Sequence, residues 1–124
     1  MKKYAQLSDC PLFQPGTDIE VWFMKREFFR DFNFGDFKGF DPKDPSKTHT
    51  LLGTCADPKP GLSYETCLKI MICQLQAERW SPNVEANELI RSKGLGHTSM
   101  SVGDCIRFRT GECFLCDNFG WKNF

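Results

Sequence analysis

The stretch Gly-His-Thr-Ser-Met-Ser-Val-Gly-Asp, residues 96–104, collects side chains that could do chemistry. His97, Ser99 and Asp104 are the residue types of a hydrolytic centre, in which histidine takes the proton of a serine nucleophile and a carboxylate orients the ring. The surrounding sequence has no Gly-x-Ser-x-Gly elbow and no His-Glu-x-x-His motif. The missing context disfavours catalysis here, and no catalytic residue is assigned.

Two other interpretations of this stretch require no reaction. In one, Ser99, Ser101 and Asp104 hydrogen-bond nearby backbone amides and staple an ordered corner, as these residue types do in turns. In the other, the same three residues and His97 form the polar rim of a binding site. Such a site would respond to pH near neutrality, because an imidazole titrates there. The residue types favour the stapled corner and leave the binding rim open.

A second candidate surface is the segment 28–40, which holds six of the twelve phenylalanines. Their spacing fits neither a helix nor a strand throughout, although a helical turn over 27–32 is expected, and the glycines and prolines that follow favour a loop. The rings either anchor this loop to the core or form an exposed patch for a protein partner. Stacking of single-stranded nucleic acid is a third interpretation. The predicted contact residues are Phe34, Phe37 and Phe40.

Charge and composition narrow the class of protein. The chain has 124 residues, 40% of them hydrophobic and 26% charged, which suits one soluble domain. Lys+Arg and Asp+Glu number 16 each, and a zero formal charge argues against a dominant nucleic-acid-binding surface. A local basic patch remains the alternative, and its candidate residues are Arg91, Lys93, Arg107 and Arg109.

Localisation follows from what the sequence lacks. No run of about 18 apolar residues is present, so no membrane span is predicted. Residues 1–13 carry two lysines without an apolar stretch after them, unlike a signal peptide. We therefore expect a cytoplasmic protein, in the host cytoplasm if a phage encodes it.

The chain has seven cysteines, an odd number that speaks against a disulfide framework. The single C-x-x-C is Cys113–Cys116, and on a strand these two side chains face opposite sides of the sheet. A zinc site needs further ligands, and the chain has only two histidines, His49 and His97. The cysteines are predicted to be mainly small buried hydrophobes, and neither a metal nor another cofactor is predicted.

Periodicity and punctuation predict the elements that position these residues. After a loosely structured lead-in over 1–18, one domain spans 19–124, and its three tryptophans are expected in or beside the core. Both faces of the strand near 19–26 are apolar, which places that strand inside a sheet. The remaining elements are a strand near 48–56, helices near 63–80 and 82–93 that begin after Ser63 and Ser81, and a terminal hairpin turning at Thr110-Gly111. The predicted fold class is α+β, a small antiparallel sheet with a C-terminal β-hairpin, the long helix packed on one face, and the short second helix.

The pattern Gly-His-x-Ser-Met-Ser-Val-x-Asp over 96–104, followed by Asp-x-Phe-Gly-Trp over 117–121, resembles the C-terminal signature of the YodL-like family. That family comprises small proteins and domains of conjugative elements, plasmids and phages. The likeness spans roughly 19–124 and is specific in the last quarter, where Gly103 and Cys105 depart from the usual pattern. It implies a small mixed fold and a mobile-element setting, and it supplies no catalytic residues.

These observations together predict a non-enzymatic accessory protein of a phage or other mobile element, which binds a host or element-encoded protein. Counter-defence or host takeover is one version of that role. One alternative is a nucleic-acid-binding accessory protein. The other is a small hydrolase-like enzyme that uses His97, Ser99 and Asp104. The sequence leaves the oligomeric state open.

Overall fold

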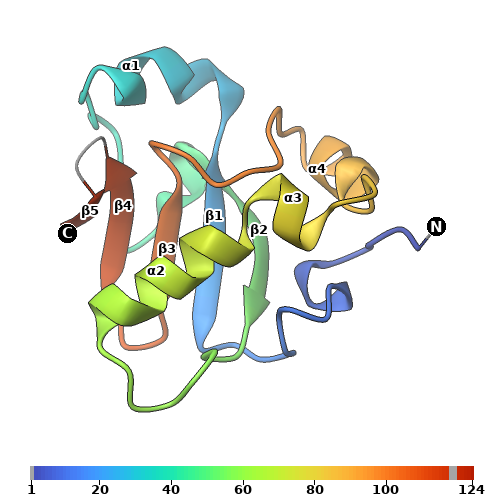
Figure 1. Cartoon of the computed structure of the whole chain (residues 1–124). Helices are drawn as coiled ribbons and strands as arrows, with labels where there is room; N and C mark the ends of the chain where they lie inside the picture. The colour runs from blue at the N-terminus through green and yellow to red at the C-terminus, as the bar shows by residue number, and fades with distance from the viewer. Residues whose placement is uncertain (1, 118–119) are drawn as a thin grey trace.

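The computed structural model describes residues 2–117 and 120–124. Its centre is an antiparallel sheet of five strands in the spatial order β2-β1-β3-β4-β5 (Figure 1). In chain order the strands are β1 (Ile19–Met24), β2 (His49–Cys55), β3 (Cys105–Phe108), β4 (Cys113–Asp117) and β5 (Gly120–Asn123). The predicted α+β class and the C-terminal hairpin are confirmed. Strand β5 was not predicted. Its residues are exposed or half-buried and show no apolar alternation, so the sequence carries no strand signal there.

Strand β1 is an interior strand, as its two apolar faces predict. It pairs with β2 on one side and with β3 on the other, both antiparallel. Val21 and Phe23 point into the larger hydrophobic cluster, whereas Trp22 and Met24 belong to a second cluster across the sheet. Because side chains alternate along a strand, one short segment contributes to both cores.

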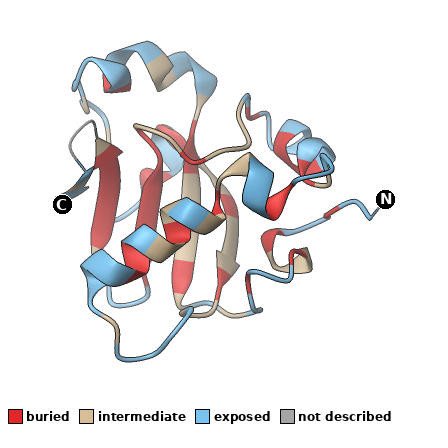
Figure 2. Cartoon of the chain, viewed as in Figure 1, coloured by how far each residue is buried: buried red, intermediate tan, exposed pale blue. Residues whose placement is uncertain are grey.

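Helices cover the face of the larger cluster. α2 (Tyr64–Gln74) crosses the sheet in front of β1 and β3, and Figures 1 and 2 show its inner side and the strands beneath it buried. The prediction of one continuous helix over 63–80 is wrong, because the helix ends at Gln74. A separate turn, α3 (Ala77–Trp80), follows, and it brings the fully buried Trp80 into the core. The N-cap at Ser63 is confirmed, because its side chain accepts a hydrogen bond from the Thr66 amide.

The second predicted helix is shorter than its sequence pattern suggests. α4 runs only from Asn87 to Ser92 rather than over 82–93. Ser81 does not cap a helix at its own position, since its hydroxyl accepts a hydrogen bond from the Ala86 amide across a turn. Val84 has a positive φ of 58° in that turn, a conformation that helical geometry does not allow. The predicted ending at Gly94 is confirmed by its φ of 70°.

The amino-terminal segment belongs to the core. A loosely structured lead-in is expected over 1–18, and a 3-10 turn at Leu7–Asp9 is the helical element it contains. However, four of its side chains are buried in the larger cluster: Tyr4, Leu7, Cys10 and Phe13. The segment thus packs against the sheet and against α4 instead of standing apart from the fold.

The opposite face of the sheet is covered by residues 26–47, which we call the aromatic segment. It contains a 3-10 turn at Arg26–Phe28, the short helix α1 (Phe29–Asn33) and a loop that closes with a 3-10 turn at Pro45–Lys47. Its most buried ring is Phe32, which packs among Met24, Cys105, Cys113 and Leu115. Within the described ranges, no helix is long and apolar enough to cross a membrane.

Candidate functional site

Asp104 lies at the centre of the candidate site and is completely buried. Its Oδ1 accepts a hydrogen bond from the Met24 amide at 2.8 Å, and its Oδ2 accepts one from the Ser101 amide at 2.9 Å. His97 Nε2 stands 3.0 and 2.9 Å from the two oxygens. The carboxylate therefore ties the corner 97–104 to the end of β1, which is a structural use of a charged group.

Competing effects act on the pKa of Asp104. Burial penalises the charged form and raises the pKa above its ordinary value. The hydrogen bond from His97 and those from the amides of Met24 and Ser101 act in the opposite direction, because they stabilise the ionised carboxylate. Burial is the largest of these effects, so the pKa is raised.

The half-buried ring of His97 is held by aromatic side chains. Its ring stacks on Phe23 with centroids 4.7 Å apart and an interplanar angle of 10°, and Phe29 meets it edge-on at 5.7 Å. Its Nδ1 is buried and has no hydrogen-bond partner in the part of the chain that the structure describes. The ring joins both clusters, because Phe23 and Phe29 lie on opposite faces of the sheet.

The residues between His97 and Asp104 dock onto the break between α2 and α3. The Ala77 amide donates to Ser99 Oγ at 2.8 Å, and Trp80 Nε1 donates to the Thr98 carbonyl at 3.1 Å. The Met100 amide donates to the Leu75 carbonyl at 3.1 Å. Two of these bonds explain why the helix stops, because Ser99 and Met100 satisfy the Ala77 amide and the Leu75 carbonyl, which a continuous helix would pair within itself.

The corner is thus ordered as expected, and its fastening differs from the expected one. Local bonds contribute, because the Asp104 amide donates to the Ser101 carbonyl. Most of the fastening, however, runs to β1 and to the α2–α3 break. Ser101 contributes its backbone, and its hydroxyl makes no hydrogen bond within the described residues.

The hydrogen bonds of the corner do not form the serine–histidine contact that the hydrolase interpretation requires. Ser99 Oγ accepts the Ala77 amide, and no hydrogen bond joins Ser99 to His97 among the described residues. The Asp104 carboxylate accepts hydrogen bonds from two backbone amides and lies within hydrogen-bond distance of one imidazole nitrogen. A nucleophile must lie within hydrogen-bond reach of its base, and His97 Nδ1 has no hydrogen-bond partner among residues 2–117 and 120–124.

His49, which the sequence indicated only as one of two histidines too few for a zinc site, is completely buried. Its Nε2 lies 2.6 Å from the Gly103 carbonyl, and its Nδ1 lies 2.7 Å from Thr48 Oγ1. A carbonyl can only accept, so Nε2 donates and Nδ1 accepts the hydroxyl proton. Burial is the main reason that the pKa of His49 falls to about 4. The sequence signal for a buried, hydrogen-bonded histidine at position 49 was its place at the start of a short apolar strand.

The structure separates the three phenylalanines that were predicted to form a contact surface. Phe37 and Phe40 pack edge-on against Phe32, with centroids 5.4 and 6.4 Å away, and both also contact Phe124. They are anchors of the aromatic segment. Phe34 is 82% exposed and pairs with no ring in the described part of the chain. Of these three phenylalanines, only Phe34 therefore presents a free aromatic surface.

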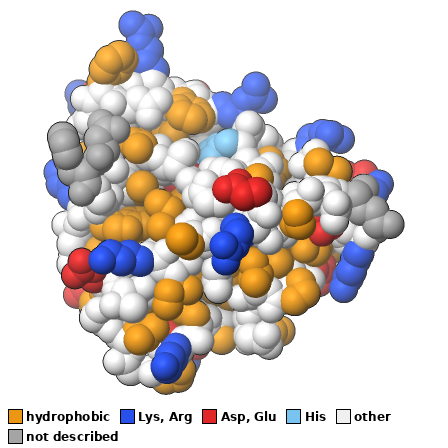
Figure 3. All heavy atoms as spheres, viewed as in Figure 1, with side chains coloured by type: hydrophobic (Ala, Val, Ile, Leu, Met, Phe, Trp, Pro, Cys, Tyr) orange, Lys and Arg blue, Asp and Glu red, His pale blue; other side chains and the backbone are white. Residues whose placement is uncertain are grey.

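The four basic residues of the nucleic-acid alternative are not gathered. Arg107 Nη1 lies 3.2 Å from Glu20 Oε1, and Arg109 Nη1 lies 3.7 Å from Asp18 Oδ1. Arg91 lies in α4, and Lys93 follows its last residue. Figure 1 shows α4 well separated from the carboxyl end of β3, where Arg107 and Arg109 lie. On the face viewed in Figure 3, Lys and Arg side chains are scattered instead of forming one patch.

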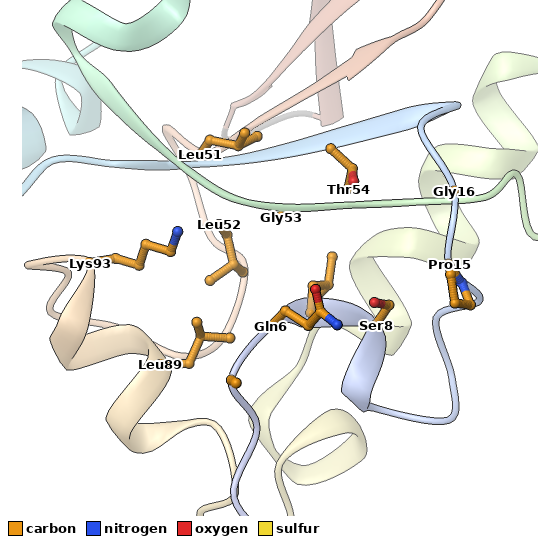
Figure 4. A pocket seen from close by; sticks show the side chains of 12 residues that line it. Gln6, Ser8, Pro15, Gly16, Leu51, Leu52, Gly53, Thr54, Leu89 and Lys93 are labelled. Atoms are coloured by element: carbon orange, nitrogen blue, oxygen red, sulfur yellow. The ribbon is translucent and has the colours of Figure 1, made fainter.

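The pocket in Figure 4 lies along the edge strand β2 and has a volume of about 410 Å³. Leu51–Thr54 form one wall, and the amino-terminal segment and Leu89 of α4 line the others. Lys93 is the only residue of the predicted sites that lines it. No residue of the corner 97–104 lines this pocket.

The described residues contain no group of three or more His, Cys, Asp or Glu side chains placed to hold a metal ion. Comparison of the chain with protein-family models, with curated proteins and with solved structures found no match. The resemblance to the YodL-like family stays a prediction, and Phe119 of its signature lies outside the described residues.

Proposed function

We propose that this chain is a non-enzymatic accessory protein of a phage or other mobile element, and that it binds a host or element-encoded protein through the surface around Phe34. The observation that carries the proposal is the exposure of this one ring in a segment whose other rings are anchored. Large aromatic side chains dominate the energetics of protein interfaces, so a presented ring is a suitable anchor for a partner.

The local structure explains why Phe34 stays exposed while its neighbours are buried. Phe34 follows the last residue of α1, and its amide donates to the carbonyls of Arg30 and Asp31. Gly35 then turns the chain with a φ of 80°. The ring is therefore carried on an ordered helix end, which lowers the entropy lost when a partner binds.

The other residues of the predicted site support a protein-binding role only indirectly. Asp104 fastens the corner to β1, and His97, which stacks on Phe23 and meets Phe29 edge-on, joins that corner to α1. They thus stabilise the platform on which Phe34 sits. The mobile-element setting is supported by the resemblance of residues 96–121 to the YodL-like signature.

The test is partner capture with a variant that leaves the core intact. Because the Phe34 ring makes no ring contact in the described structure, Phe34→Ala should fold normally. Candidate partners are first identified by mass spectrometry after capture from lysate of the host, and the affinity for each purified candidate is then measured. We expect Phe34→Ala to weaken binding about 30-fold, the effect of removing a hot-spot side chain of ~2 kcal/mol.

The matched control is Leu12→Ala, which removes another partly exposed hydrophobic side chain from the amino-terminal segment. It should bind as the unmodified protein does. Equal affinity of Phe34→Ala and the unmodified protein for every purified partner would exclude the Phe34 surface. Replacing Phe37 or Phe40 is a poorer test, because both rings support the fold.

A further inference from the structure

We propose that Cys105 and Cys113 form a redox-active dithiol, which hydrogen peroxide converts to a disulfide between β3 and β4. Both cysteines lie on the face of the sheet beneath the aromatic segment, and their oxidation does not depend on the proposed partner binding. Six of the seven cysteines are buried, and this pair is distinguished by the contact between its sulfurs.

The two side chains meet through the register of the hairpin. Cys105 pairs with Leu115 and Cys113 pairs with Arg107, so the two cysteines are diagonal neighbours on one face of the sheet. Their Sγ atoms are 3.1 Å apart, and both residues are fully buried. A disulfide bond is about 2.05 Å long, so its formation requires the sulfurs to approach by roughly 1 Å.

The surroundings give the two thiols different roles. Either sulfur can donate in this contact. With Cys105 as the donor, the hydrogen bond lowers the pKa of Cys113, with a further contribution from the charge of Arg107, the residue that pairs with Cys113 across the hairpin. Burial opposes that shift. The same hydrogen bond and burial raise the pKa of Cys105. Cys113 is therefore the attacking thiolate and Cys105 the resolving thiol.

The reaction balances with one molecule of peroxide. The Cys113 thiolate attacks one peroxide oxygen, the O–O bond breaks, and hydroxide leaves and takes up the thiol proton as water. The sulfenic acid so formed on Cys113 is then attacked by the sulfur of Cys105. The S–O bond breaks, the S–S bond forms, and the departing oxygen leaves as a second water with the Cys105 proton. Both sulfurs are oxidised, and the peroxide is reduced.

The position of the pair selects a small oxidant. Rings of the aromatic segment, Phe37 and Phe40 among them, pack over the cluster that contains both sulfurs. Hydrogen peroxide is little larger than water, whereas glutathione disulfide must place its own sulfurs in line with the attacking thiolate. We therefore expect peroxide to oxidise the folded protein faster than glutathione disulfide does.

The other cysteines serve as internal references. The pKa of Cys55 is raised by burial to about 12, and that of Cys67 to about 11. Cys116 also has a pKa raised by burial to about 11, and alternation along β4 places it on the opposite face from Cys113. These thiols lack the donated hydrogen bond and should react more slowly.

The experiment treats the folded full-length protein with hydrogen peroxide, blocks free thiols under denaturing conditions, and maps the products by mass spectrometry. Trypsin cleaves after Arg107 and so separates Cys105 from the peptide that holds Cys113 and Cys116. We expect loss of two hydrogen atoms from the intact mass and a link between these two peptides. It should form at least about tenfold faster than oxidation of Cys55 or Cys67, because the raised pKa values of those thiols leave them far less thiolate, an effect that the lower nucleophilicity of a low-pKa thiolate offsets only in part.

Fragmentation of the linked peptides assigns the bond without any variant. A bond at Cys113 supports the proposal, and a bond at Cys116 overturns it. Cys116→Ser should keep the link, whereas Cys113→Ser should abolish it. The proposal is also overturned if Cys105 and Cys113 are both recovered with blocked, unoxidised thiols while the exposed Cys73 has been oxidised.

Discussion

At the scale of single residues, neighbouring groups of the same type do different work. Ser99 and Ser101 stand two positions apart in one corner, and both are half-buried. The Ser99 hydroxyl accepts the first amide of α3, whereas Ser101 contributes its own amide to Asp104. A serine-rich stretch therefore indicates hydrogen bonding in general, and which atom is used depends on the partner that the fold supplies.

The two serines can be separated by mutation. Ser99→Ala leaves the Ala77 amide without its acceptor, and we expect unfolding free energy to fall by ~1 kcal/mol, as on loss of a helix cap. Ser101→Ala removes a hydroxyl with no hydrogen bond in the described structure, and the change should stay within about 0.5 kcal/mol. Urea unfolding followed by tryptophan fluorescence measures both, because Trp80 is fully buried beside the corner. Equal effects would contradict the assignment.

At the scale of elements, the corner, β1 and the aromatic segment meet at Gly103. This residue has a φ of 97°, and a Cβ placed on it would stand 2.6 Å from Met24 Sδ and 3.3 Å from Phe32 Cβ. Its carbonyl accepts from His49, and its amide donates to the Cys116 carbonyl. Close contact on every side explains why a glycine is required at this junction.

Gly103→Ala should therefore be destabilising beyond the ordinary cost of its backbone conformation. Gly111 provides a matched control, since its φ is also 97° and no atom lies within 4 Å of a Cβ built there. We expect Gly111→Ala to cost about 1 kcal/mol. Gly103→Ala should cost an additional 1–3 kcal/mol, roughly, because it overpacks the core. Thermal and urea unfolding of both variants measure the difference, and equal stability losses would show that Met24 yields without cost.

At the scale of the whole molecule, stability should depend on pH through His49. The unfolded chain binds a proton on this ring near pH 6.5, whereas the folded protein does so only near pH 4. The stabilisation is thus fully present above about pH 6.5 and is lost as pH falls toward 4. The loss approaches ~3 kcal/mol, because each pKa unit corresponds to about 1.4 kcal/mol.

Ring titration by NMR and urea unfolding between pH 7 and 4.5 check this dependence. Asp104 acts in the opposite direction, since burial raises its pKa and the folded state gains relative stability as that carboxyl is protonated. The difference between the unmodified protein and His49→Asn isolates the contribution of His49. A His49 ring that titrates near pH 6.5 in the folded protein would exclude the predicted shift.

Some of this molecule was readable from local sequence. The apolar faces of Ile19–Met24 placed β1 inside the sheet, and Gly94 correctly marked the end of α4, because both signals act within a few residues. The end of α2 at Gln74 could not be predicted from local sequence. The groups that end the helix come from Thr98, Ser99 and Met100, more than twenty residues away.

The candidate site shows the same limit. Residue types correctly suggested that the corner 97–104 is built by side-chain hydrogen bonds, and they could not show that Asp104 reaches the Met24 amide across 80 residues. The phenylalanine spacing likewise could not tell the anchor Phe37 from the exposed Phe34, because exposure depends on which rings the sheet accepts. Burial of a particular side chain is a property of the tertiary fold.

The pairing of β1 with β3 bears on how the chain is made. Ile19 lies opposite Phe108, so the middle of the sheet joins segments almost ninety residues apart. During synthesis the early strand emerges long before β3, and the edge of β1 that pairs with β3 stays unpaired until residues 105–108 have left the ribosome. Closure of so large a loop is slow. In the meantime the nascent polypeptide is a substrate for chaperones that bind apolar strands.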